Sequence, residues 1–289
     1  EIQVASVGIA VANENSGTIR SSGLISAEIA GIGVEGSNAA TGIIDNSGSI
    51  MTAGYGIYVG ANNDGTITNS GSITANGTDG AVSGIAVEGN SNVVDNSGPI
   101  TSRGTGIQIA GSAATTTNSG IITSTGTGIV IGGAVTTGLT NSGTIVASGT
   151  NAAGIQVAGT TATLANTGTI TAAGNGVRLG AGVTGALTNG GTITAQNAGV
   201  AVIGNIGGQF TNDGSISGRT AGVVVTGNAQ SAITNTGSIV SAEGIALHVG
   251  GSTQSIDNSD TISGTTGIQV LSGVAGDLTN SGTITGTAQ

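Results

Sequence analysis

The sequence predicts an all-β protein, a right-handed parallel β-helix (β-solenoid) of about twelve coils of ~23 residues, with three strands per coil. Two observations predict this fold. A five-residue motif recurs through the whole chain at a nearly constant spacing, and each repeat contains three short strand-like segments separated by glycine-rich corners. Because no break interrupts the repeats, residues 1–289 are predicted to form a single β-solenoid domain.

The repeated motif begins with Asn and ends with Ile, with Gly in the middle, as in Asn-Ser-Gly-Thr-Ile. Its copies are separated by 22 to 31 residues, and only one of them replaces the glycine, with Asp260. The motif begins at Asn15, Asn46, Asn69, Asn96, Asn118, Asn141, Asn166, Asn189, Asn212, Asn235, Asn258 and Asn280.

Each repeat is expected to supply three strands. The first follows the motif glycine (Thr169–Thr171 is an example), the second has a Gly-Ile-x-Val pattern (Gly154–Val157), and the third precedes the next Asn (Leu187–Thr188). Alternation places one small aliphatic face of each strand inward. Such a unit cannot bury its apolar face alone, so successive repeats must stack.

The twelve motif asparagines are predicted to form a structural ladder at one corner of the solenoid. Asn tolerates left-handed backbone conformations, and its amide can pair with the Asn one coil above and below. Asp260, which replaces the motif glycine, is expected to strain or reshape its corner.

Composition excludes several functional classes. Fourteen Asp and Glu residues stand against four Arg and no Lys, which gives a net charge of −10, and aromatic residues make up 1%. Nucleic-acid binding needs basic and aromatic side chains, and no apolar run is long enough to cross a membrane. The chain has no cysteine and no recognisable cofactor or metal motif, so no cofactor is predicted.

An enzymatic role finds little support, although polysaccharide lyases and hydrolases share this fold class. Asp45, Asp95 and Asp257 occupy one repeat position but never on adjacent coils, and Glu35 and Glu88 are predicted to lie two coils, roughly 10 Å, apart. His248, the only histidine, is expected to face solvent. A polysaccharide-active enzyme therefore ranks as the second alternative function.

Two irregular repeats are interpreted as insertions at one edge of the rod. The 31-residue repeat has about eight extra residues, placed within 20–30, and the 27-residue repeat has about four, near 76–83. Insertions often carry the binding face of a repeat protein. The candidate partner patch at this edge comprises Arg20, Glu28, Tyr55, Tyr58 and Asp79, and tolerated surface loops are the alternative interpretation.

Paired hydroxyls on the first strand of each repeat suggest an alternative, ice-binding function. Ser or Thr flanks the inward Ile in pairs such as Thr169/Thr171 and Thr192/Thr194, with interruptions at Arg20, Met51, Val146 and Val240. A flat Thr-x-Thr array resembles the ice-binding face of β-solenoid antifreeze proteins. The β-propensity of Thr explains the same pattern without ice.

The recurring Asn-(Ser/Thr)-Gly-(Ser/Thr)-Ile and Gly-(Ile/Val)-x-(Val/Ile/Leu) patterns, without cysteine or lysine, resemble the β-helical passenger regions of bacterial autotransporter-type surface proteins and adhesins. The resemblance covers the whole chain. It implies export, display at the cell surface, and a role in adhesion, aggregation or surface coating. The family's C-terminal membrane barrel and amphipathic C-terminal cap have no counterpart here.

The termini suggest a mode of self-association. The chain is expected to begin on a second strand (Ile2–Val4) and end just after a first strand (Thr283–Thr285), so that a following copy would continue the coil in phase. Head-to-tail stacking into a filament is one interpretation, and excision from a longer array is the other. The predicted function is a non-enzymatic, extracellular structural or adhesive β-solenoid at a bacterial cell surface, whose partner is itself or a cell-surface receptor.

Overall fold

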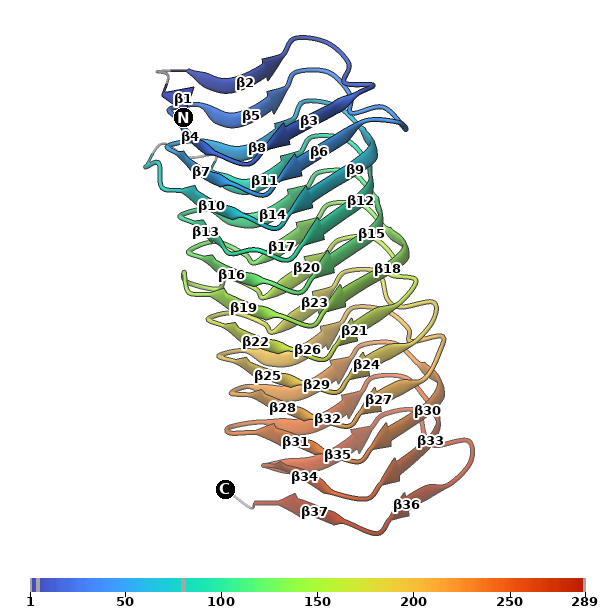
Figure 1. The fold of residues 1–289 in the computed structure, drawn as a ribbon. Coiled ribbons are helices and arrows are strands. Elements are labelled where there is room, and N and C mark those ends of the chain that lie inside the picture. Colours follow the sequence, from blue (N-terminus) through green and yellow to red (C-terminus); the bar gives the residue numbers. More distant parts are fainter. Residues whose placement is uncertain (1, 4–5, 79–81, 288–289) are drawn as a thin grey trace.

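The computed structural model is a parallel β-solenoid, which confirms the predicted fold class (Figure 1). It describes residues 2–3, 6–78 and 82–287. Within these residues the chain passes through three parallel sheets once per coil, in the constant order A, B, C, and contains no helix. The sheets run side by side along the whole rod, with the two ends of the chain at opposite ends (Figure 1).

Sheet A has thirteen strands and sheets B and C have twelve each. Sheet A comprises β1 (Ile2–Gln3), β4 (Leu24–Ala27), β7 (Ser49–Thr52), β10 (Ser72–Ala75), β13 (Ile100–Ser102), β16 (Ile121–Ser124), β19 (Thr144–Ala147), β22 (Thr169–Ala172), β25 (Thr192–Ala195), β28 (Ser215–Gly218), β31 (Ser238–Ser241), β34 (Thr261–Gly264) and β37 (Thr283–Gly286). Sheet B comprises β2 (Val7–Val11), β5 (Ala30–Val34), β8 (Tyr55–Val59), β11 (Ser83–Val87), β14 (Thr105–Ile109), β17 (Ile129–Ile131), β20 (Ile155–Val157), β23 (Val177–Leu179), β26 (Ala198–Val202), β29 (Ala221–Val225), β32 (Ile245–Val249) and β35 (Thr266–Val270). Sheet C comprises β3 (Thr18–Ser21), β6 (Ile43–Asn46), β9 (Asn63–Asn69), β12 (Ser91–Asn96), β15 (Ala113–Asn118), β18 (Val135–Asn141), β21 (Leu164–Asn166), β24 (Leu187–Asn189), β27 (Phe210–Asn212), β30 (Ala229–Asn235), β33 (Thr253–Asn258) and β36 (Leu278–Asn280).

The core consists of aliphatic columns that run the length of the rod. In sheet A one column is isoleucine on every coil, because each motif Ile pairs in register with the next, as Ile145 does with Ile170 and Ile170 with Ile193. Sheets B and C add Ile, Val and Leu columns, and nearly all of these side chains are fully buried. The burial of four or so aliphatic side chains per coil is therefore shared between neighbouring coils.

Glycine at the start of the sheet B strands brings sheets A and B close together. An added Cβ at Gly154 would lie 2.3 Å from Ile170 Cγ2 and 2.6 Å from the carbonyl oxygen of Gly176. Glycine occupies this position on every coil except one, where Ala246 is fully buried between Gly222 and Gly267. The thin cross-section thus depends on the missing side chain and not on a left-handed backbone, since none of these glycines has a positive φ.

The first coil differs from the sequence prediction. The motif at Asn15 lies between sheets B and C, and its Ile19 stacks on Ile44 in sheet C instead of starting a strand of sheet A. A degenerate copy of the motif, Ser21-Ser-Gly-Leu-Ile25, takes that place, and Ile25 pairs with Ile50. The predicted eight-residue insertion within 20–30 is therefore wrong, because the repeat that begins at Ser21 ends at Asp45, and Asn46 is in register with Ser21.

The prediction that the N-terminal strand is a second strand, in sheet B, is also wrong. Ile2 pairs with Ile25 in sheet A, and the first strand of sheet B is β2. A second copy joined to the C-terminus would not continue the coil with the expected phase. The other predicted insertion does lie between β10 of sheet A and β11 of sheet B, although residues 79–81 of it are outside the described residues.

No helix among the described residues is long and apolar enough to cross a bilayer.

Candidate functional site

A ladder of asparagine amides runs along the corner between sheets C and A. Each amide donates from Nδ2 to Oδ1 of the Asn on the next coil, at 2.7 to 2.8 Å, through ten successive bonds. The ladder contains Asn46, Asn69, Asn96, Asn118, Asn141, Asn166, Asn189, Asn212, Asn235, Asn258 and Asn280. All ten bonds point the same way, so their amide dipoles add along the rod and strengthen one another.

The ladder asparagines have ordinary backbone conformations. The one positive φ among the described non-glycine residues is that of Asn151, outside the ladder, so the predicted left-handed role is wrong. The side chain instead satisfies the corner: Nδ2 of Asn96, for example, also donates to the carbonyl oxygen of Gly98, 2.9 Å away. The motif glycine is needed for space, because a Cβ at Gly143 would lie 2.0 Å from the carbonyl oxygen of Gly120.

Asp260 keeps its corner in register but changes two backbone hydrogen bonds. Its N–H does not donate to the carbonyl oxygen of Asn235, whereas the N–H of Gly237 donates to that of Asn212 at 3.1 Å. The amide of Thr261 lies 3.3 Å from the carbonyl oxygen of Gly237, whereas the equivalent bond from Ser238 to Gly214 is 2.9 Å. The side chain turns outward and accepts a hydrogen bond from Thr261 Oγ1. The expected reshaping is thus limited to one missing and one lengthened backbone hydrogen bond.

Asn15 belongs to a second, shorter ladder that the sequence analysis missed. Its amide donates to Asn38, Asn38 donates to Asn63, and Asn63 donates to Ser91 Oγ, at 2.7, 2.7 and 2.9 Å. This ladder runs along the corner between sheets B and C and is buried in the first four coils. On later coils the same column becomes mostly apolar, through Ala113, Val135 and their successors. The predicted pairing of Asn15 with Asn46 is therefore wrong.

The N-terminal end of the long ladder has an unsatisfied acceptor, and this leads to a testable prediction. Ser21 is in register with Asn46, whose buried Oδ1 has no hydrogen-bond partner. Replacing this serine, Ser21→Asn, is expected to supply the missing donor and stabilise the protein by about 1 kcal/mol. Urea unfolding measures the gain. Ser22→Asn on the exposed neighbour is the control, and equal midpoints for the two variants would contradict the prediction.

Sheet A presents a wide outer face without any charged side chain. Its outward positions form two columns on either side of the buried isoleucines, and most of these residues are Ser or Thr. Thr169, Thr171, Thr192 and Thr194 are exposed, and Met51 and Ile121 are the most exposed apolar interruptions. Arg20, expected to interrupt this array, is absent from it.

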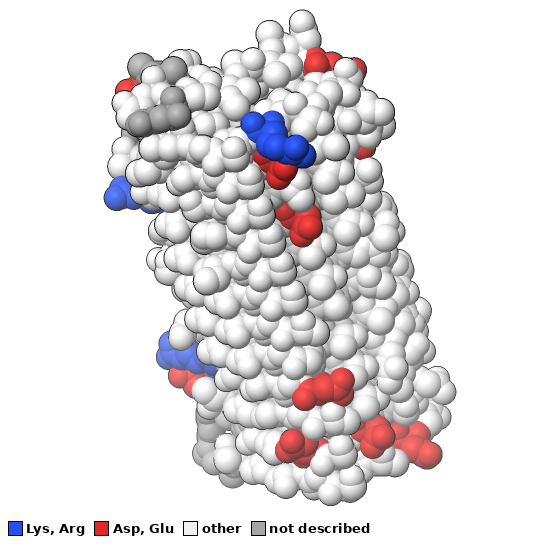
Figure 2. Space-filling view, in the orientation of Figure 1, with Lys and Arg blue, Asp and Glu red and all other residues white. Residues whose placement is uncertain are grey.

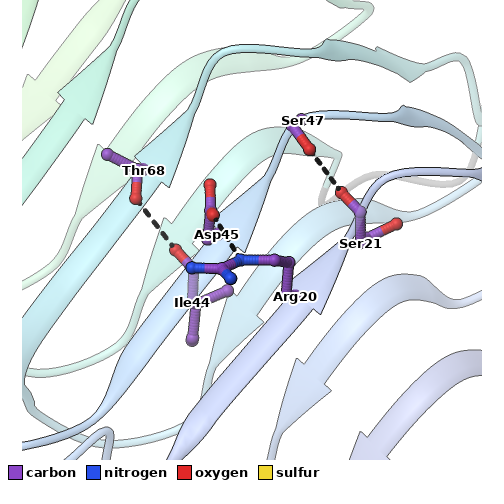
Figure 3. Close-up of polar contacts among 6 residues, drawn as sticks. All are labelled: Arg20, Ser21, Ile44, Asp45, Ser47 and Thr68. Carbon is purple, nitrogen blue, oxygen red and sulfur yellow. Dashed lines mark hydrogen bonds and ion pairs between the residues drawn. The ribbon is translucent and has the colours of Figure 1, made fainter.

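The predicted partner patch is divided by the structure. Arg20 lies on β3 of sheet C, where its Nε donates to Asp45 Oδ2 at 2.9 Å (Figure 3). Glu28 and Tyr55 line one hollow of about 520 Å³ at the corner between sheets A and B, and Tyr58 stands next to Tyr55. Asp79 lies outside the described residues. Arg20 is thus separated from the two tyrosines, which share a strand of sheet B.

The aspartates that share one repeat position lie apart from one another on sheet C. Asp45 and Asp95 face outward from sheet C with Thr68 between them, two coils apart. His248 faces outward, and its Nδ1 lies 2.9 Å from Gln269 Oε1. Within residues 2–3, 6–78 and 82–287, no three His, Cys, Asp or Glu side chains lie close enough to hold a metal ion. These groups can bind ligands through hydrogen bonds and charge on exposed faces.

The fold and these surfaces define a class of protein, the β-solenoid repeat proteins. Comparisons with protein-family models, with curated proteins and with solved structures give no match.

Proposed function

We propose that the protein is a non-enzymatic, extracellular structural and adhesive rod, displayed at a bacterial cell surface. The observation that carries the proposal is the unbroken stacking of twelve similar coils through all three sheets. At ~4.8 Å per coil the rod is about 55 Å long. Repeated aliphatic columns and an amide ladder supply stiffness along the rod, and this repetition supports a scaffold role.

Contact through the rod ends is one adhesive mode that this geometry supports. The strands β35, β36 and β37 are the last strands of the three sheets in the described chain, and β1, β2 and β3 are the first. Because sheet A has thirteen strands and sheets B and C have twelve each, a second copy could pair at the rod end through sheet A, with Ile284 beside Ile2, or through sheets B and C, with Ile268 beside Ile9, but not through all three sheets at once. The other mode is binding of a cell-surface receptor along the rod faces.

Surface display on non-adherent bacteria tests the proposed function. Cells that display the chain on a heterologous anchor are expected to aggregate or to adhere to surfaces more than cells with the anchor alone. Deletion of residues 167–189 removes one whole coil and joins Asn166 to Gly190 in register, so it should preserve folding and adhesion. Deletion of residues 167–178 breaks the register and should abolish both.

Two results would contradict a scaffold function. One is a displayed, folded rod that leaves aggregation and adhesion at the level of the anchor. The other is loss of adhesion on removal of the single coil while circular dichroism shows an intact fold. Analytical ultracentrifugation of the purified chain separates the two adhesive modes, because end-to-end stacking depends on protein concentration.

A second candidate function, ice binding, is favoured by one specific observation. The charged side chains of the described chain lie outside the strands of sheet A, and β22, β25 and β28 carry consecutive outward hydroxyl pairs. Neighbouring coils are ~4.8 Å apart and residues i and i+2 of a strand ~6.6 Å apart, so the hydroxyls form a regular flat lattice. Such a face can order water in a repeating pattern.

Thermal hysteresis and inhibition of ice recrystallisation measure this activity. An ice-binding face predicts that Thr171→Lys with Thr194→Lys removes the effect, because the charged side chains disrupt the lattice. Thr188→Lys with Thr211→Lys makes the same change on the outer face of sheet C and should leave the effect intact. Absence of hysteresis in the unmodified chain would eliminate this candidate.

A further inference from the structure

Two tyrosines form an aromatic pair on the outer face of sheet B. The ring centroids of Tyr55 and Tyr58 are 5.0 Å apart, with 30° between the ring planes. Both side chains are half-buried. They are the only tyrosines of the chain, which has no tryptophan. A half-buried aromatic pair on a surface where most side chains are small provides a platform with an exposed π face.

The residues in register with Tyr58 on the coils before and after it are small and buried. Its register neighbours are Gly33 and Ala86, which have little or no side chain. A Cβ added at Gly60 would lie 3.3 Å from the Tyr58 hydroxyl, so the phenol extends along the strand toward Gly60. Of these three register positions, Tyr58 alone therefore carries a large side chain, and part of that side chain is exposed.

Carboxylates flank the hydroxyl end of the platform. Glu35 and Glu88 follow Val34 and Val87, just as Gly60 follows Val59, so they lie on the coils before and after Gly60. Burial is the main cause that raises the pKa of both tyrosines above the ordinary value, and the negative charge of Glu88 adds to it. Glu35 acts in the same direction on the pKa of Tyr58. The negative charge of both carboxylates therefore acts on the Tyr58 hydroxyl, and that of Glu88 acts on the Tyr55 hydroxyl as well.

These carboxylates lack a basic partner. Among the described residues the ion pairs are Arg20 with Asp45 and Arg219 with Glu243, so Glu28, Glu35 and Glu88 are not in ion pairs there. Arg103 lines an adjoining hollow, which shares Gly77, Thr78 and Val82 with the hollow that Tyr55 lines. The negative charge around the two rings is therefore not neutralised within the described chain.

The charge of the whole chain is also uneven along the rod. Residues 1–95 contain nine acidic residues and one arginine, whereas residues 96–212 contain two arginines and no acidic residue. On the face shown in Figure 2, charged side chains lie toward the two ends, with few between them. The tyrosine pair is in the strongly acidic third, whose field attracts cations.

We propose that Tyr55, Tyr58, Glu35 and Glu88 form a binding site for a cationic side chain, specifically an arginine guanidinium of a basic partner protein. The guanidinium would stack on the exposed ring and donate hydrogen bonds to the flanking carboxylates. Both interactions are typical of arginine, which combines a planar cation with a fork of N–H donors. The site does not depend on the scaffold function proposed above.

Binding of a hexa-arginine peptide to the full chain tests this assignment. Fluorescence anisotropy of the labelled peptide gives the affinity, and the intrinsic tyrosine emission reports contact with the two rings directly. Bound peptide should change the tyrosine emission and lower the pKa of the phenols, measured from tyrosinate absorbance, because a nearby cation favours the phenolate. A hexaglutamate peptide should do neither.

Variants distinguish a specific binding site from general electrostatic attraction of the peptide to an acidic protein. Tyr58→Leu should weaken hexa-arginine binding by about tenfold, whereas Tyr58→Phe keeps the ring and should stay within about twofold. The pair Glu35→Gln with Glu88→Gln should weaken binding more than Asp213→Asn with Asp257→Asn, which removes the same charge at the far end of the rod. Circular dichroism verifies that each variant is folded.

Three results would overturn the proposal. They are an unchanged affinity for Tyr58→Leu, equal losses for the two pairs of carboxylate variants, and a tyrosine signal that responds to neutral chitohexaose but not to hexa-arginine. The last result would assign the rings to a sugar-binding platform.

Discussion

Replacing Gly154 by valine, Gly154→Val, is expected to destabilise the rod by more than about 3 kcal/mol, and this is among the largest effects of any single substitution. The first atom of the new side chain would meet Ile170 Cγ2 at 2.3 Å and the carbonyl oxygen of Gly176 at 2.6 Å. One contact lies in the core and the other on the backbone of the next coil. Neither neighbour can move without separating sheet A from sheet B or breaking the stack.

Gly154→Ala is expected to cost less, because the protein accommodates one alanine in this column. The corner that leads to Ala246 is one residue longer, since Leu247 follows Ile239 by eight positions whereas Val223 follows Ile216 by seven. Extra chain length gives the backbone room to move outward. Position 154 follows a corner that is already long, with Ile155 ten residues after Ile145, so alanine should be tolerated there with a moderate loss.

Urea unfolding followed by circular dichroism measures both substitutions. The matched control is Gly190→Val on a nearby coil, where an added Cβ would have one neighbour, Thr167 Cγ2, 3.9 Å away. Thr167 and Thr236 occupy the same repeat position as Gly190 and have the shape of valine, so the control should be close to neutral. Equal losses at positions 154 and 190 would show that the glycine column does not limit the approach of the sheets.

The repeat predicted the fold because each coil repeats the same physical solution. Inward Ile at a fixed distance from Asn and Gly appears on coil after coil, so the three sheets and most of the ladder could be derived from spacing alone. The first coil could not, because Thr18–Ser21 and Leu24–Ala27 have similar local patterns. Contacts with the next coil decide which of the two segments joins sheet A. Asn15 bonds to Asn38 at the corner between sheets B and C, whereas Ile25 pairs with Ile50 in sheet A.

The candidate sites were less predictable than the fold. Arg20 was placed with the tyrosines because the first repeat was counted wrongly, and the correct register moves it to sheet C. The aromatic contact between Tyr55 and Tyr58 depends on rotamers that no repeat pattern specifies. The short ladder was missed because Asn38 and Asn63 lack the motif around them. Their separation of 25 residues, within the range of the repeat, was the available signal.

Removal of one amide from the middle of the long ladder, Asn166→Ala, is expected to cost about 3 kcal/mol. Asn166 accepts from Asn141 Nδ2 at 2.7 Å and donates to Asn189 Oδ1 at 2.8 Å, in a fully buried column. Its loss leaves a donor and an acceptor without their partners, and it interrupts the aligned dipoles of the neighbouring bonds.

The last rung provides the matched comparison for Asn166→Ala. Asn280 is exposed and accepts from Asn258 alone, so Asn280→Ala breaks one ladder bond at a place that water can reach and should cost about 1 kcal/mol or less. Unfolding free energies from urea titration measure the difference. A larger loss at 166 than at 280 means that the ladder contributes through buried, mutually dependent bonds. Equal and small losses would mean that the backbone and the aliphatic columns hold the coils together without the amides, and that the recurrence of Asn has another cause.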